Sequence, residues 1–155
     1  MPEKKTIENA KRDLKQGKSP STAAGEFVHE EIEHVREGKH GARSAKQAIA
    51  IGLSKARRAG VPLPAPEKGQ TSESTRRAAK RELATAQGRR SARPTSRKRS
   101  RATRQALERE PKTAASSAAL SRQAKSAAAR RRRKAKSQPR AKSQPRAGSN
   151  AAAAR

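Results

Sequence analysis

The sequence predicts a mainly α-helical protein in which a small N-terminal helical hairpin is followed by a long basic tail, largely disordered or made of isolated helices. Twelve large apolar residues precede position 65, whereas three, Leu83, Leu107 and Leu120, follow it. Residues 1–68 hold 14 basic and 9 acidic side chains, a net charge of +5, and residues 69–155 hold 26 and 4, a net charge of +22. Burying a leucine-sized side chain contributes about 1.5–3 kcal/mol, and ordering one residue costs about 1–2 kcal/mol. We therefore expect no core in the second half.

The first 60 residues contain the helical patterns. Residues 1–18 predict a short helix, because Ile7, Ala10 and Leu14 recur at helical spacing before Gly17. Residues 19–60 predict a hairpin of two helices, near 20–37 and 44–59. The pair Ser19-Pro20 is typical of a helix start, and Gly38 and Gly60 are typical of helix ends. The expected hairpin core consists of Phe27, Val28, Ile32, Val35, Ile49 and Leu53. Gly52 lies on the apolar face, which indicates either a close helix crossing or plain tolerance.

A Pro-rich linker is predicted at 61–70, and a basic low-complexity tail at 71–155. Three stretches of the tail, 72–86, 101–109 and 113–135, are rich in residues that favour helix. The six-residue sequence Ala-Lys-Ser-Gln-Pro-Arg occurs at 135–140 and again at 141–146. We expect this end of the chain to be low-complexity sequence without a fold.

The sequence argues against several classes of function. It contains no G-x-S-x-G, P-loop or G-x-G-x-x-G motif, so we expect no enzyme, no catalytic residue, no cofactor and no small-molecule substrate. The absence of cysteine excludes disulfides and thiolate metal sites. No apolar run approaches the length of a membrane span, and the basic segments lack the large apolar face that membrane-surface helices need. We expect a cytoplasmic protein, located at the nucleoid.

Histidines and glutamates are concentrated in the segment from His29 to His34. Two zinc-binding histidines on a helix are spaced four residues apart, whereas these two are five apart and lie about 140° apart around the helix axis. His40 lies beyond the helix end. We therefore expect surface residues and no metal site. An acidic stripe, formed by Glu26, Glu30, Glu33 and Glu37, is either a solvated face or a surface that binds the protein's own tail or a basic partner.

The basic tail predicts nucleic-acid binding by phosphate neutralisation, without sequence specificity. The strongest candidate contacts are five consecutive cations, Arg130, Arg131, Arg132, Arg133 and Lys134, followed by Arg97, Lys98, Arg99 and Arg101. In the hairpin, the further candidates for phosphate contacts are Lys46, Lys55, Arg57 and Arg58. DNA is favoured over RNA because the tail has no aromatic residue on which bases would stack. In the alternative hypothesis, the 19–60 hairpin binds a protein partner and the tail only concentrates the protein on DNA.

The segment 18–64 resembles a family of small basic bacterial proteins that are often labelled plasmid stabilisation or DNA-binding proteins. The closest feature is Ser44-Ala-Lys-Gln-Ala-Ile-Ala-Ile-Gly-Leu-Ser-Lys-Ala-Arg-Arg-Ala-Gly60. The resemblance implies a histone-like or plasmid-maintenance role, the latter including an antitoxin-like factor, and it transfers no functional residue. The tail is similar in composition to linker-histone-like bacterial tails.

Overall fold

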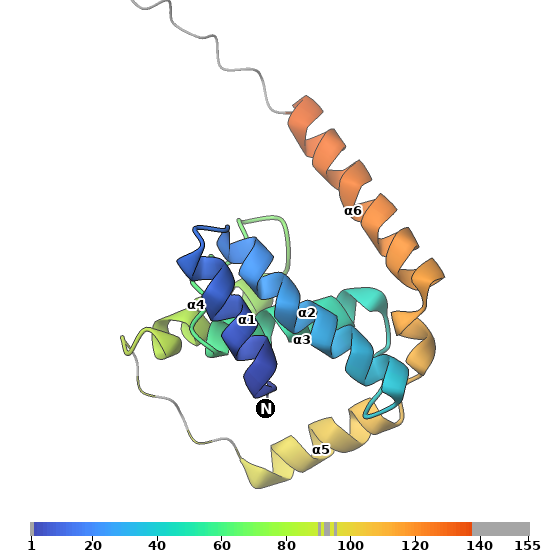
Figure 1. Ribbon diagram of the computed structural model, residues 1–155. Helices are drawn as coiled ribbons and strands as arrows, with labels where there is room; N and C mark the ends of the chain where they lie inside the picture. The colour runs from blue at the N-terminus through green and yellow to red at the C-terminus, as the bar shows by residue number, and fades with distance from the viewer. Residues whose placement is uncertain (1, 90, 92–93, 95, 138–155) are drawn as a thin grey trace, which may run out of the picture. The chain divides into compact units, whose positions relative to one another are not determined.

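The structure, a computed structural model, describes residues 2–89, 91, 94 and 96–137. These residues form helices and no β-strand, in the order α1 (Lys4–Lys15), α2 (Pro20–Glu37), α3 (Ala45–Arg58), α4 (Glu73–Ala86), α5 (Arg97–Glu108), the 3₁₀-helix η1 (Lys112–Ala115) and α6 (Ser117–Ser137) (Figure 1). The described residues divide into two units, the first ending at Gln123 and the second beginning at Ala124. None of the described helices is long and apolar enough to cross a bilayer.

Helices α2 and α3 form the centre of the first unit, and side-chain caps fix where each begins. The Ser19 side chain accepts a hydrogen bond from the backbone N–H of Thr22, and Pro20 occupies the first turn. The Ser44 side chain accepts in the same way from Gln47. Each cap satisfies a backbone donor that the helix itself leaves unpaired. Helix α1 packs against α2, and α4 packs against α3.

Gly52 marks a close crossing of α2 and α3. A Cβ atom at this position would lie 2.7 Å from the Cα of Val28 and 2.9 Å from the carbonyl oxygen of Phe27. Only a residue without a side chain allows the two backbones to approach this closely. Of the two interpretations left open by the sequence, the structure therefore supports the close crossing.

The buried apolar residues form two clusters. In the first, Phe27 packs with small residues of α1, α2 and α3 and with Val61 of the predicted linker. In the second, Val35 packs with Ala42, Ala48, Ala114 and Ala115. Of the expected hairpin core, Phe27 and Val35 are fully buried, whereas the other four are only half-buried: Val28, Ile32, Ile49 and Leu53.

The predicted arrangement of a hairpin followed by a largely disordered tail is wrong, because helices continue through the chain to Ser137. Part of the predicted tail also belongs to the core. Helix α4 buries Ala79 and η1 buries Ala114 and Ala115, and η1 packs against both α2 and α3. The carbonyl oxygens of Leu107 and Pro111 accept hydrogen bonds from the backbone N–H groups of Gly41 (2.8 Å) and Ala42 (3.2 Å).

Small residues explain the difference. The second half of the chain has few leucine-sized side chains, but the packing sites on α4 and η1 are filled by alanines. Alanine loses no side-chain entropy on burial, and it is also the strongest helix former. A segment rich in alanine therefore folds against a neighbouring helix without large apolar residues. The second copy of the Ala-Lys-Ser-Gln-Pro-Arg repeat, and half of the first, lie outside the described residues.

Candidate functional site

Helix α5 presents a cationic surface. It carries five basic side chains, none of which pairs with an acidic residue of the described ranges: Arg97, Lys98, Arg99, Arg101 and Arg104. All are exposed, α5 buries no residue, and it packs against no other described helix. Its attachment is at its C-terminal end, where Leu107 and Pro111 bond to the loop after α2. These cations are therefore available to an external anion.

Two sides of α5 face different surroundings. Arg97, Lys98 and Arg101 line a shallow hollow with neutral side chains of the same helix. Arg99 and Arg104 instead line a cavity of about 700 Å³ together with residues of α2, α3 and the loop between them. The first side is open to a long polyanion such as a nucleic acid, whereas the second is limited by the cavity wall.

On α6, the five consecutive cations from Arg130 to Lys134 belong to the second unit, and they are also exposed. A helix turns about 100° per residue, so five consecutive side chains point in every direction around the axis. Arg130, Arg131 and Lys134 fall within an arc of about 100°, so about three of the five face one surface directly. The structure thus places the two predicted phosphate-binding clusters on separate helices, with about three cations of each on one side.

Two of the four hairpin cations, Lys55 and Arg57, are unavailable to phosphate, whereas Lys46 and Arg58 are exposed. Lys55 is only 18% exposed, and its Nζ lies 2.5 Å from Oε2 of Glu31 and 3.7 Å from Oε1 of Glu30. Arg57 is buried, and it donates a hydrogen bond to the carbonyl of Pro64. Burial lowers the pKa of the Arg57 guanidinium. Arg58 pairs with Glu82 of α4 at 3.6 Å. The sequence interpretation of these residues as phosphate contacts is therefore wrong for Lys55 and Arg57.

The structure brings together a group of buried charges between α2 and α3. Glu31 is 0% exposed, and its two oxygens lie beside Lys55 on one side and His40 on the other. Neither the contact with Lys55 nor the contact with His40 has the geometry of a hydrogen bond, so both Glu31 oxygens are without a hydrogen-bond partner. Glu30 is also buried and accepts a hydrogen bond from the backbone N–H of Glu3. The expected polar surface is therefore wrong for Glu30 and Glu31.

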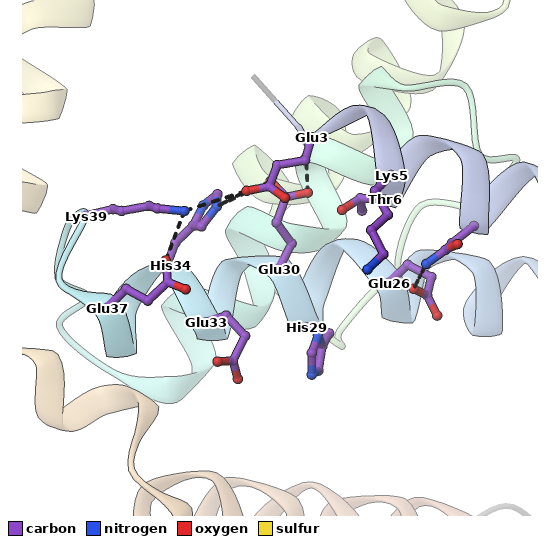
Figure 2. Close-up of a pocket in the computed structure, with 11 residues that line it drawn as sticks. Glu3, Lys5, Thr6, Glu26, His29, Glu30, Glu33, His34, Glu37 and Lys39 are labelled. Atoms are coloured by element: carbon purple, nitrogen blue, oxygen red, sulfur yellow. Dashed lines mark hydrogen bonds and ion pairs between the residues drawn. The ribbon is translucent and has the colours of Figure 1, made fainter.

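An acidic groove lies between α1 and α2 (Figure 2). The predicted acidic stripe lines it. Asn9 of α1 donates a hydrogen bond to Glu26, and the backbone N–H of Glu3, the residue before α1, donates one to Glu30. A hydrogen bond from His34, and then the charge of Lys39, lower the pKa of the Glu3 carboxyl. A hydrogen bond to Glu37 raises the pKa of Lys39. The groove is thus partly neutralised by its own cations.

Sequence reasoning missed Glu31, although a signal was present. Glu31 follows Phe27 by four residues and precedes Val35 by four, so it occupies the same helical face as the two largest fully buried apolar side chains. A carboxylate at such a position needs a cation on the facing helix, because an unpaired buried charge is very costly. Lys55, three residues after Gly52 on α3, supplies it.

Comparisons with family models, with curated proteins and with solved structures gave no match to this chain.

Proposed function

We propose that this protein binds DNA without sequence preference, as a histone-like protein of the bacterial nucleoid, and that the cations of α5 and α6 contact phosphates. The observation that carries the proposal is the state of α5. Five exposed cations on a helix of twelve residues have neither an acidic partner nor a packed neighbour in the described ranges.

Such a helix is costly to hold without a counter-charge. Arg97 and Arg101 are four residues apart, and like charges at this spacing destabilise a helix by about 0.2–0.5 kcal/mol. An isolated helix of this length is also marginal in water. Phosphates lying along α5 would remove the repulsion and release condensed counterions, which is the main source of non-specific affinity.

The same surfaces argue against reading of bases. Neither α5 nor α6 contains an aromatic residue, so neither offers a stacking platform for single-stranded bases. Arginine is the main cation of both helices, and its guanidinium suits bidentate contact with phosphate. Phosphate contacts fix position but carry no sequence information, so the proposal favours duplex DNA of any sequence.

The number of contacts sets the expected salt dependence. Three cations of the α5 hollow and three on one side of α6 give about six phosphate contacts. The logarithm of the binding constant then falls with the logarithm of salt concentration with a slope of about −5, at roughly 0.9 per contact.

The test is a triple substitution on α5 with a control of equal charge. Replacement of Arg97, Lys98 and Arg101 by Gln should make the slope less steep by about 3, so that it becomes about −2 to −3. In the control, Lys4, Lys11 and Lys15 of α1 are replaced by Gln; these are exposed as well, but α1 lies beside the acidic groove. The control should change the slope by less than about 1. Equal effects of both triple substitutions would contradict the assignment to α5.

The alternative, a protein partner on the 19–60 hairpin in a plasmid-maintenance or antitoxin-like role, has less support. Such a partner needs a free apolar face, and α1, α4 and η1 already pack against α2 and α3. Ile49 and Leu53 remain half-exposed, in a hollow of about 240 Å³ shared with α4. This apolar surface is small compared with the exposed cationic surfaces of α5 and α6.

A further inference from the structure

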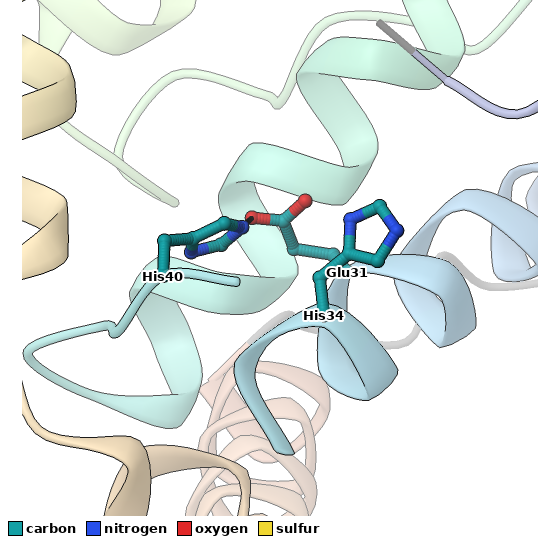
Figure 3. Close-up of side chains that lie close together, drawn as sticks. All are labelled: Glu31, His34 and His40. Atoms are coloured by element: carbon teal, nitrogen blue, oxygen red, sulfur yellow. Dashed lines mark ion pairs between the residues drawn. The ribbon is translucent and has the colours of Figure 1, made fainter. Parts of the chain in front are cut away.

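Glu31, His34 and His40 place one possible ligand atom each within 4.8 Å of one another (Figure 3). Glu31 lies on α2, His34 lies near the end of the same helix, and His40 lies in the loop that follows it. Two imidazoles and a carboxylate form a donor set that binds Zn²⁺ and related transition metals.

The surroundings of His40 favour a cation beside it. Nδ1 of His40 lies 3.1 Å from the carbonyl oxygen of Gly41, and Nε2 lies 3.2 Å from Oε1 of Glu31. A neutral imidazole has a single N–H, so it cannot donate to both oxygens. If Nδ1 donates to the carbonyl, Nε2 turns a lone pair toward the carboxylate. A backbone carbonyl on the far nitrogen is also the usual orienting contact of a metal-bound histidine.

The Glu31 carboxylate also favours a cation at this position. Its side chain is 0% exposed, and neither oxygen accepts a hydrogen bond. Lys55 approaches Oε2, which leaves Oε1 directed toward the side where His40 lies. A cation bound at Oε1 would satisfy an oxygen whose burial is otherwise costly, while the ion pair with Lys55 is kept.

We propose that Glu31, His34 and His40 bind a divalent transition-metal ion, with Zn²⁺ as the best match, and that a fourth position stays open to the cavity. Ligand atoms around tetrahedral Zn²⁺ are about 3.4 Å apart. The 3.2 Å between Nε2 of His40 and Oε1 of Glu31 already fits this spacing, so the main adjustment is an approach of His34 by up to about 1.4 Å. The cavity of about 700 Å³ is lined by all three side chains and gives the ion a path from solvent.

The charges around the site set its strength. Lys39, Lys55, Arg58, Arg99 and Arg104 also line the cavity and oppose a cation. Two further carboxylates near His34 act in the other direction, with Glu3 at 3.3 Å and Glu30 at 3.9 Å from its Nε2. We therefore expect binding that is weaker than at a structural zinc site.

A bound ion would join the end of α2 to the loop that carries His40. The next residues of this loop, Gly41 and Ala42, hold the carbonyls of Leu107 and Pro111, which attach α5. Metal binding should therefore protect these two loop amides from hydrogen exchange. The inference does not depend on DNA binding.

The experiment titrates the full-length, metal-free chain with Zn²⁺ by calorimetry and with Co²⁺ by visible absorption. We expect one ion per chain, with the strong visible absorption of four- or five-coordinate Co²⁺. Substitutions His34→Ala and His40→Ala should each weaken binding at least tenfold, since even the loss of an outer contact costs about 10–100-fold. The matched control is His29→Ala, the third histidine of the chain, which is exposed on α2 and outside the cluster.

Three results would overturn the proposal. The first is no binding to the wild-type chain at about 100 µM free metal. The second is binding with only the weak absorption of six-coordinate Co²⁺, a readout that needs no variant. The third is an equal loss of affinity in the His29→Ala, His34→Ala and His40→Ala chains. Far-UV circular dichroism shows whether each variant is folded, and both cluster variants keep the Glu31–Lys55 pair.

Discussion

The close crossing of α2 and α3 gives a prediction with a built-in control. Substitution of Gly52 by Ala adds a Cβ that meets the Cα of Val28 at 2.7 Å and the carbonyl oxygen of Phe27 at 2.9 Å. Carbon atoms in contact prefer about 3.5–4.0 Å, so the helices must separate by about 1 Å. The atoms met belong to the backbone and cannot rotate away as a side chain does.

The expected magnitude is the difference of two effects. Overpacking costs about 1–3 kcal/mol, and contact with backbone places Gly52 in the upper half of that range. Replacing Gly by Ala inside a helix returns about 1 kcal/mol. We therefore expect Gly52→Ala to lower the free energy of unfolding by about 1–2 kcal/mol.

The matched control is Gly25, which is exposed on α2 and has no atom within 4 Å of an added Cβ. Gly25→Ala keeps only the helix-forming gain and should raise the free energy of unfolding by about 0.5–1 kcal/mol. Urea denaturation followed by circular dichroism measures both variants. A Gly52→Ala chain as stable as the Gly25→Ala chain would refute the close crossing.

Two further substitutions test the buried parts that the sequence did not indicate. Ala115→Glu places a carboxylate in a fully buried site and should destabilise the chain by at least about 2 kcal/mol, whereas Ala118→Glu, exposed on α6, should have little effect. Equal urea midpoints for these two variants would show that η1 does not belong to the core. Glu31→Gln removes the nearest charge from Lys55 and should cost about 2–3 kcal/mol, because Glu30 remains only as a more distant partner. Glu33→Gln removes the more exposed ion pair between Glu33 and Arg36 and should cost less than about 1 kcal/mol. A similar loss of stability in the Glu31→Gln and Glu33→Gln chains, measured by thermal unfolding, would contradict the buried pair.

The sequence was most informative where large side chains and caps specify local structure. Ser19, Pro20 and Gly38 bound α2 as expected, and Ser44 precedes α3. These signals act over a few residues, so they can be identified without knowledge of the fold.

The rest depended on contacts between distant segments. Ala114 and Ala115 have no signature of burial by themselves, because alanine is common on helix surfaces and in cores alike. Their burial follows from the approach of η1 to Val35 and Ala48, a pairing that no local pattern specifies. His40 was set aside because it lies beyond α2, yet the turn after the helix returns it to Glu31.

The proposed phosphate contacts show what a count of charges can and cannot predict. The cations of α5 and α6 were identified from charge alone, and their exposure is compatible with that interpretation. Lys55 was counted as one more cation, because a charge count does not distinguish a solvated lysine from one that neutralises a buried carboxylate.

The most direct test of the proposed function is the affinity of the full-length chain for two unrelated DNA duplexes, measured over a series of salt concentrations. We expect equal affinities for the two duplexes and a straight line of slope about −5 against the logarithm of salt concentration. A strong preference for one duplex, or an affinity that does not change with salt, would contradict binding by phosphate neutralisation.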